Sequence, residues 1–536
     1  MRNFVVRLIL VGLVLSAVCR KSPAASPPVP EVLVRFHFVG AEQLNANTNL
    51  ATLKGIWSLP PTVELRGKAL QKLSAFAGEL LTNRMGLTNP LGAARLINPL
   101  LEDLLQAETH LEIRRSSHEA AEWTLALQLQ QERAQLWQNN LSNLMALCQA
   151  GTPIQTTLDG FSGWEAKLPR ETNVLRCLRL GQWTLLVFGP ERLRTNYGVF
   201  PELKTKGRPL PLAKDYFLEA EADFPRLAQG LPASPATEWP QTHLLLSAKG
   251  DHLRSEMKLR FAKKGNWPLE KWQIPTNTIR DPLVSFTAGQ GVGPWLSQLE
   301  LLKPLELNPA PNQFFAWAQA YSAFHVYGAM PVSDATSVLN HFTKVLLPKI
   351  NTNLQERAVG ELVRLTNQPG VFWRGLPIIV PFVHPSPEPG GHFIYGGIFP
   401  APVGTNLPPP ELFAEFASRT NLLYYDWEIT QARLAQLRPL FKLLSIVTSK
   451  PFQNTNSLAE KWLGEIEPSL GNTTTEISVT SPQELTLVRK SHLGLTGVEL
   501  IALAHWAESP DFPRLNFDIS FGPKRDLPKA TAKEKK

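Results

Sequence analysis

Two carboxylates on one predicted strand have the spacing that could support hydrolysis. Asp426 and Glu428 alternate with apolar residues between positions 422 and 430, so both project from one strand face beside Tyr424. Glycoside hydrolases use such a pair as the acid and the nucleophile or base. Three similar segments carry polar pairs of other types at these positions, which favours a solvated strand face. Asp426 and Glu428 are therefore catalytic candidates with a structural alternative.

A second group could bind a metal ion. His384 and His392 flank a loop that contains Glu388 and should connect two apolar strands. Two imidazoles and one carboxylate suit a divalent transition metal, provided that the loop folds Glu388 back toward its own base. The alternative is a set of polar residues that merely flank a loop. The sequence indicates no other cofactor.

The cysteines allow two interpretations. Cys148 and Cys177 could form a disulfide that closes a loop of about 30 residues and contributes about 3 to 4 kcal/mol in the chain-entropy model. Alternatively, Cys148 continues an apolar helical stripe with Trp137 and Leu144, where a thiol packs as a small hydrophobic group. Cys19 is a possible lipidation site, although the bulky Val18 before it fits such a signal poorly.

The elements that must position these residues recur along the chain. Alternating apolar and polar residues that lead into a helix begin near positions 32, 216, 284 and 423. Strand-turn-strand patterns follow near 109, 242 and 476. Duplication of one module is the simplest explanation, and local hairpins favour antiparallel pairing. We therefore predict an α+β fold of two to three tandem modules, with mainly antiparallel sheets and packed helices.

Proline-rich connections suggest where the modules end. One such connection spans 202–212 and another spans 400–410. The predicted organisation has five parts, which are a signal peptide at 1–25, a first module at 26–205, a second at 206–405, a third, partial module at 406–523, and a basic disordered tail at 524–536.

Three apolar segments support a resemblance. They are 422–430, which leads into a helix, 377–384, and 390–400 with its paired glycines. These segments resemble parts of large exported bacterial proteins of unknown function that are built from duplicated α+β modules. The resemblance implies an architecture and carries no activity.

The first 25 residues have the layout of an export signal. Arg2 and Arg7 lie at the start of an apolar run that reaches Val18, and small residues follow up to Ala25. The run is shorter than the roughly 20 residues needed to span a bilayer. We therefore expect a cleaved signal and a periplasmic or envelope location, with a retained N-terminal anchor or a lipid anchor as alternatives.

The net charge of +8 comes from the two ends of the chain. Residues 1–24 contribute +4 and residues 524–536 another +4, which leaves the body between them neutral. A neutral body argues against binding to nucleic acid. The basic tail could contact an anionic membrane surface.

No catalytic motif accompanies these features. The sequence favours an exported cell-envelope protein of non-catalytic binding or structural function, with an unknown protein or an envelope ligand as its partner. An envelope hydrolase acting on glycans or esters is one alternative. A carrier of lipids or other apolar ligands, indicated by the apolar strands between 376 and 399, is the other. The sequence indicates no oligomeric state.

Overall fold

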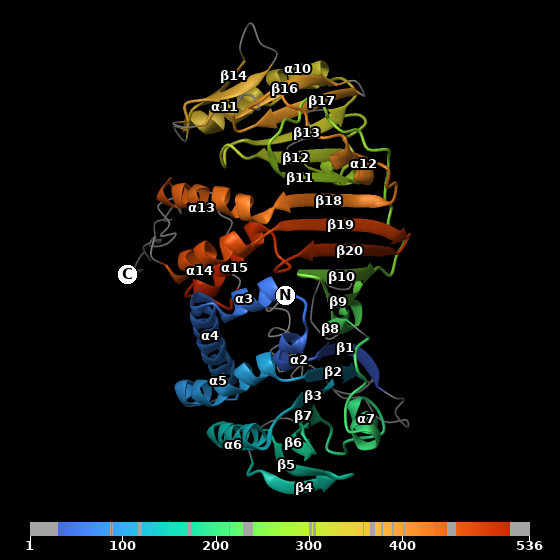
Figure 1. The fold of residues 1–536 in the computed structure, drawn as a ribbon, viewed down its shortest axis with the longest axis vertical. Helices are drawn as coiled ribbons and strands as arrows, with labels where there is room; N and C mark the ends of the chain where they lie inside the picture. The colour runs from blue at the N-terminus through green and yellow to red at the C-terminus, as the bar shows by residue number, and fades with distance from the viewer. Residues whose placement is uncertain are drawn as a thin grey trace, which may run out of the picture.

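The computed structural model combines helices with antiparallel strands (Figure 1) and confirms the predicted α+β class. The predicted signal peptide, Cys19 and the basic tail lie outside the described residues. Within the described residues, no helix is long and apolar enough to cross a bilayer. The structure describes residues 30–514 apart from 86, 88, 116–120, 150, 169–172, 214, 229–238, 300–302, 304–306, 357–358, 365–369, 377–378, 389–390, 400–402 and 448–456.

The strands form two sets of ten in chain order. The first set is β1 (Glu31–Phe38), β2 (Thr109–Arg115), β3 (Glu122–Gln128), β4 (Ile154–Leu158), β5 (Phe161–Lys167), β6 (Val174–Leu180), β7 (Trp183–Gly189), β8 (Tyr216–Asp223), β9 (Gln241–Lys249) and β10 (His252–Arg260). The second set is β11 (Leu283–Gln290), β12 (Gln313–Gln319), β13 (Val326–Val332), β14 (Glu361–Arg364), β15 (Val371–Arg374), β16 (Phe382–Glu388), β17 (Gly391–Gly397), β18 (Leu422–Ile429), β19 (Asn472–Ser481) and β20 (Glu484–Ser491).

All twenty described strands belong to one sheet. Its pairings, each antiparallel, give the order 4-5-6-7-3-2-1-8-9-10-20-19-18-11-12-13-17-16-15-14. In Figure 1 the strands run across the long axis of the molecule. The sheet is continuous from β4 at one end to β14 at the other.

The two halves of the sheet have the same strand order. β1 lies between β2 and β8, and β11 lies between β12 and β18 in the same way. The halves are joined where β10 pairs with β20. The four strands predicted from alternation are β1, β8, β11 and β18, which occupy matching places. The boundaries predicted at 205/206 and 405/406 fall inside the two halves, because β8 pairs with β1 and β18 with β11.

The helices differ more between the halves than the strands do. The first half contains α2 (Ala41–Ala46), α3 (Ala51–Ser58), α4 (Pro60–Met85), α5 (Pro90–Gln106), α6 (Gln131–Leu147), α7 (Val199–Lys206) and α8 (Phe224–Ala228). The second contains α9 (Gly293–Leu296), α10 (Ala335–Val345), α11 (Leu347–Glu356), α12 (Glu411–Ala417), α13 (Thr430–Val447), α14 (Leu458–Ile466), a 3-10 turn (Glu467–Ser469) and α15 (Gly497–Glu508).

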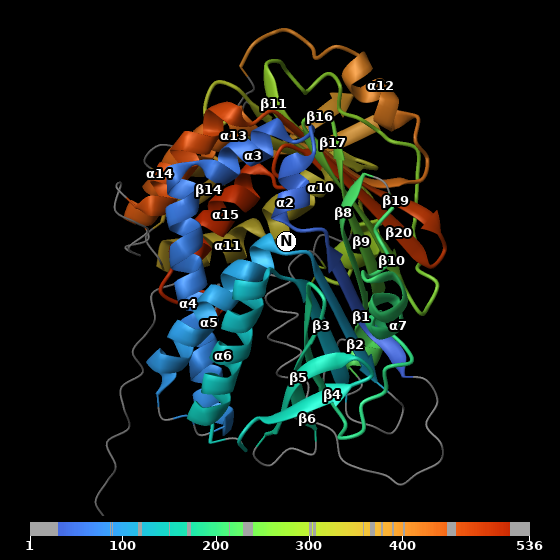
Figure 2. The same ribbon diagram turned by 60° about the horizontal axis from the view of Figure 1, so that its bottom comes forward.

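The long helices gather on one side of the sheet (Figures 1 and 2), which we call the helical face. There α5 and α6 share a buried core with β1 and β3, to which Leu100, Trp137 and Phe36 contribute. Helix α4 instead packs with α14 and α15, for example through Leu70 and Leu463. Because α4 belongs to the first half and its partners to the second, this core ties the halves together.

The start of α15 is fixed by its own sequence. The Thr496 hydroxyl accepts from the Glu499 amide at 3.4 Å, and the Glu499 carboxylate accepts from the Thr496 amide at 2.8 Å. This reciprocal pair satisfies two backbone amides that the first turn of a helix leaves free. The next amide, that of Gly497, donates to Glu428 at 2.8 Å, so the α15 N-terminus lies over β18.

Candidate functional site

The two predicted catalytic carboxylates lie on the helical face of β18. Asp426 accepts a hydrogen bond from the Thr287 hydroxyl of β11 at 2.6 Å. Glu428 accepts one from the backbone amide of Gly497, at the N-terminus of α15, at 2.8 Å. Burial raises the pKa of both carboxyl groups above their usual range, and it lowers that of the neighbouring Arg433.

This arrangement corrects the expectation of a solvated strand face. The side chain of Glu428 is only 5% exposed. Helices α13 and α15 cover the polar face of β18, and carboxylates beneath them need internal donors such as the Gly497 amide. Asp426 and Glu428 therefore link β18 to β11 and to α15.

The predicted metal loop does not bring its histidines together. In the β16–β17 hairpin, His384 lies opposite Tyr395, whereas His392 lies opposite Pro387. His392 and Tyr395 lie three residues apart on β17, so their side chains project from opposite faces of the sheet, and His384 shares the face of its partner Tyr395. The two imidazoles thus lie on opposite sides of the hairpin. The side chain of Glu388 lies outside the described part of the structure.

The two described cysteines are free thiols rather than a disulfide. Cys148 and Cys177 are both buried in the core of the first half, with exposures of 1% and 0%. Burial raises the pKa of Cys148 to about 11 and that of Cys177 to about 12. The apolar packing interpretation is therefore correct, and neither thiol is activated as a nucleophile.

A hollow of about 260 Å³ lies on the helical face where the halves join. Its floor comes from β8, β9, β10 and β20, and apolar side chains dominate it. The lining residues are Ala220, Ala222, Thr242, Leu244, Ser255, Met257, Leu487, Arg489 and Gly494.

Among the described residues, few side chains cover these strands. In the described residues, the connection from β8 to β9 contains only the short α8, whereas the matching connection from β18 to β19 contains α13 and α14. The side chains of Ala220 and Ala222 are also too small to fill the space above β8. In the described part of the structure, the small side chains of β8 thus leave room over the joint.

Three polar residues, Thr242, Ser255 and Arg489, line this apolar hollow. Arg489 is already neutralised, because its guanidinium donates to Glu499 at 2.7 and 3.2 Å and to the Thr475 hydroxyl at 2.9 Å. The Ser255 hydroxyl, by contrast, is buried and has no hydrogen-bond partner among the described residues. A buried hydroxyl without a partner costs about 1 to 3 kcal/mol, which a bound polar group would recover.

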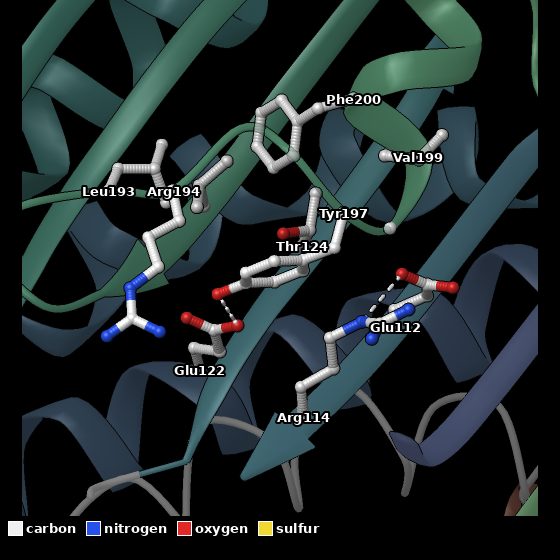
Figure 3. Close-up of a pocket in the computed structure, with 11 residues that line it drawn as sticks. Glu112, Arg114, Glu122, Thr124, Leu193, Arg194, Tyr197, Val199 and Phe200 are labelled. Atoms are coloured by element: carbon white, nitrogen blue, oxygen red, sulfur yellow. Dashed lines mark hydrogen bonds and ion pairs between the residues drawn. The ribbon is translucent and has the colours of Figure 1, made fainter. Parts of the chain in front are cut away.

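A hollow on the other face, shown in Figure 3, is filled by its own side chains. The Tyr197 hydroxyl donates to Glu122 at 2.5 Å, and Arg114 donates to Glu112 at 3.1 Å. The remaining space of about 10 Å³ is no larger than one water needs. These residues hold α7 against the sheet and leave no room for a ligand.

The opposite face of β8 and β9 carries another group. Glu219 and Glu221 of β8 converge with His243 of β9. Alternation revealed the two glutamates as a polar strand face, but His243 joins them only through the pairing of β8 with β9. A hairpin prediction that included the register could have found this cluster.

Comparisons with known proteins add no assignment. No family model and no curated protein matches the chain. A solved structure titled "Structure of crystal form III of TP0453" is similar at 9% sequence identity and a TM-score of 0.21. The match covers 46% of this chain and 84% of that one. A score this low carries no argument about fold or function.

Proposed function

We propose that this chain is an exported, non-catalytic binding protein of the cell envelope whose ligand is an amphiphile with an apolar chain and a hydrogen-bonding head. The hollow at the joint carries this proposal, through its apolar lining and the Ser255 hydroxyl, which has no hydrogen-bond partner among the described residues. The arginines and the apolar run of the first 25 residues support export.

The dimensions and chemistry of the hollow fit this class of ligand. Its volume of about 260 Å³ approaches the few hundred Å³ typical of small-ligand pockets. Burial of an alkyl chain against Leu244, Met257 and Leu487 contributes about 25 cal/mol per Å² of apolar surface. Because Glu499 already pairs with Arg489, the hollow favours a neutral head such as an alcohol over an anion.

The catalytic alternative has less support. An envelope hydrolase would need Asp426 and Glu428 facing a cleft that admits a glycan or an ester. Their oxygens instead accept hydrogen bonds from Thr287 and Gly497. The carboxylates would have to exchange these internal donors for substrate.

A fluorescence titration tests the proposed binding. Purified protein is stripped of bound lipid and titrated with N-phenyl-1-naphthylamine, whose emission rises in apolar surroundings. Dodecanol, which combines an alkyl chain with a neutral hydroxyl, should then displace the probe. Ala222→Leu should weaken probe binding about tenfold or more, because the larger side chain occupies the hollow.

Ser247→Leu is the matched control. Ser247 lies on the neighbouring strand β9 and projects from the opposite face, so this variant should bind the probe as the wild type does. Circular dichroism should show both variants folded. Equal binding by wild type and folded Ala222→Leu, or no binding by the wild type, would refute the proposal.

A further inference from the structure

The face of β8 and β9 turned away from the hollow holds three side chains of metal-ligating type. The Nε2 atom of His243 lies 2.8 Å from Oε1 of Glu219 and 3.8 Å from Oε1 of Glu221. One ligand atom from each residue lies within 4.8 Å of the other two. The side chain of His243 is 31% exposed, that of Glu219 32% and that of Glu221 44%, so the cluster is open to ions from solution.

The strand register produces this convergence. His243 lies directly opposite Glu221, and Glu219 is the next residue on the same face of β8. Two strands of an antiparallel pair hold the ligands, which is a more rigid support than a loop.

We propose that Glu219, Glu221 and His243 bind a single divalent transition-metal ion of the zinc type. Imidazole nitrogen and carboxylate oxygen are both ligands that zinc accepts at about 2.0 to 2.2 Å. Three protein ligands leave a further position for water. The cluster is distinct from the hollow, and the metal site stands independently of the proposed function.

The cations nearest to the cluster have other carboxylate partners. Arg35 approaches Oε2 of Glu221 at 3.7 Å, but its closer contact is Glu112 at 3.2 Å. The other oxygen of Glu221, Oε1, is the one that faces His243. Lys258, opposite His243 on β10, extends to Glu256 at 4.0 Å. Neither cation therefore occupies the space between the three ligands.

The second half of the sheet shows that the fold does not require this cluster. Because the two halves share one strand register, each residue has a counterpart in the second half. Tyr425 is the counterpart of Glu219, Trp427 that of Glu221, and Thr474 that of His243. None of the three counterparts is a metal ligand of the carboxylate or imidazole type. A bound ion would also link β8 to β9, which form part of the floor of the hollow, and would stabilise the folded chain by mass action.

The test is a metal titration of the untagged full chain after chelator treatment. Isothermal calorimetry with Zn²⁺ should show one equivalent bound, and Co²⁺ should give a visible absorption band from the same site. His243→Ala and Glu219→Gln should each weaken Zn²⁺ binding by roughly tenfold or more and change the Co²⁺ band.

His384→Ala is the matched control, because His384 belongs to the metal group that the sequence predicted and lies on β16. It should leave Zn²⁺ binding unchanged. Circular dichroism must show each variant folded, and Glu219→Gln, a nearly isosteric change, keeps the test interpretable if His243→Ala unfolds. Absence of Zn²⁺ binding to the wild type, or unchanged affinity in folded Glu219→Gln, would overturn the proposal.

Discussion

The two halves of the sheet share a strand order but differ in what covers the helical face. Ala220 and Ala222 of β8 correspond to Asp426 and Glu428 of β18. β8 pairs with β1, the first strand of its half, in the same register in which β18 pairs with β11, the first strand of the other half. Above the alanines is a hollow. Above the carboxylates lie α13 and α15, which enclose a hydrogen-bonded polar cluster.

The opposite face shows the reverse difference. The row Glu112, Arg35 and Glu221 runs across β2, β1 and β8 in the first half. The matching row in the second half is Trp317, Phe286 and Trp427, within an aromatic core that α12 covers. A repeated strand order thus supports a charged row in one half and a closed aromatic core in the other, because the side chains and the covering helices differ.

Replacement of Glu428 by alanine, which is the residue at the matching position Ala222 of the first half, should have the largest effect on stability. The Gly497 amide would lose its acceptor, and the buried Arg433 would lose a carboxylate neighbour. We expect the free energy of unfolding to fall by about 3 to 5 kcal/mol. Urea unfolding followed by circular dichroism measures this. Glu428→Gln, which keeps an acceptor, should lose less, and a loss below about 1 kcal/mol for Glu428→Ala would contradict the buried role.

A pH experiment addresses the opposite face. Burial lowers the pKa of His110 from 6.5 to about 4, so the unfolded chain takes up this proton at a higher pH than the folded chain does. Stability present above pH 6.5 should therefore be lost as pH falls to 4, by about 3 kcal/mol.

His110→Phe should remove that loss. The matching position in the second half is Phe315. Phe315 pairs with Ala288 in the same way that His110 pairs with His37. Urea unfolding at pH 7 and pH 4 gives the change in free energy for each protein. Equal losses in wild type and variant would show that His110 contributes nothing to acid sensitivity.

A smaller effect should follow loss of the α15 cap. In the described residues, a helix follows β20 directly but none lies between β10 and β11. Thr496→Ala removes the hydroxyl that accepts from the Glu499 amide and should lower the free energy of unfolding by about 1 kcal/mol. Thr496→Ser, which retains the hydroxyl, is the control. Equal stability of both variants would exclude the cap as a stabilising contact.

The smallest effect concerns the polar group of the hollow. Ser255→Ala removes the buried hydroxyl without changing the apolar lining. Dodecanol should bind about threefold to fivefold more weakly, whereas an unsubstituted alkane should bind unchanged. Competition against the fluorescent probe measures both ligands. A parallel loss for alcohol and alkane would assign Ser255 a packing role only.

Part of the fold could be predicted from alternation alone. β1, β8, β11 and β18 each show the period of two that a strand with two different faces requires. The hairpin β12–β13 was missed because β12 has buried residues on both faces. Phe315 and Trp317 lie on one face and Ala318 on the other, so apolar and polar residues do not alternate. Which strands lie side by side is a long-range property that no local pattern contains.

The candidate sites depended still more on long-range contacts. The alternation of Ala220 and Ala222 was visible, but the hollow also depends on the pairing of β10 with β20, which lie far apart in the sequence. Glu428 was expected in solvent because its strand looked amphipathic, yet α15, far along the chain, covers it. His243 joins Glu219 only through the register of β8 with β9.

Photoaffinity labelling tests the central claim most directly. A twelve-carbon alcohol with a diazirine on its chain is bound to the intact protein, activated by light, and located by peptide mass spectrometry. We predict labels on the strands that line the hollow, at Ala220, Ala222, Met257 and Leu487, and their loss when excess dodecanol is present. Saturable labelling elsewhere, with none on β8, β10 or β20, would contradict the assignment of the hollow as the binding site.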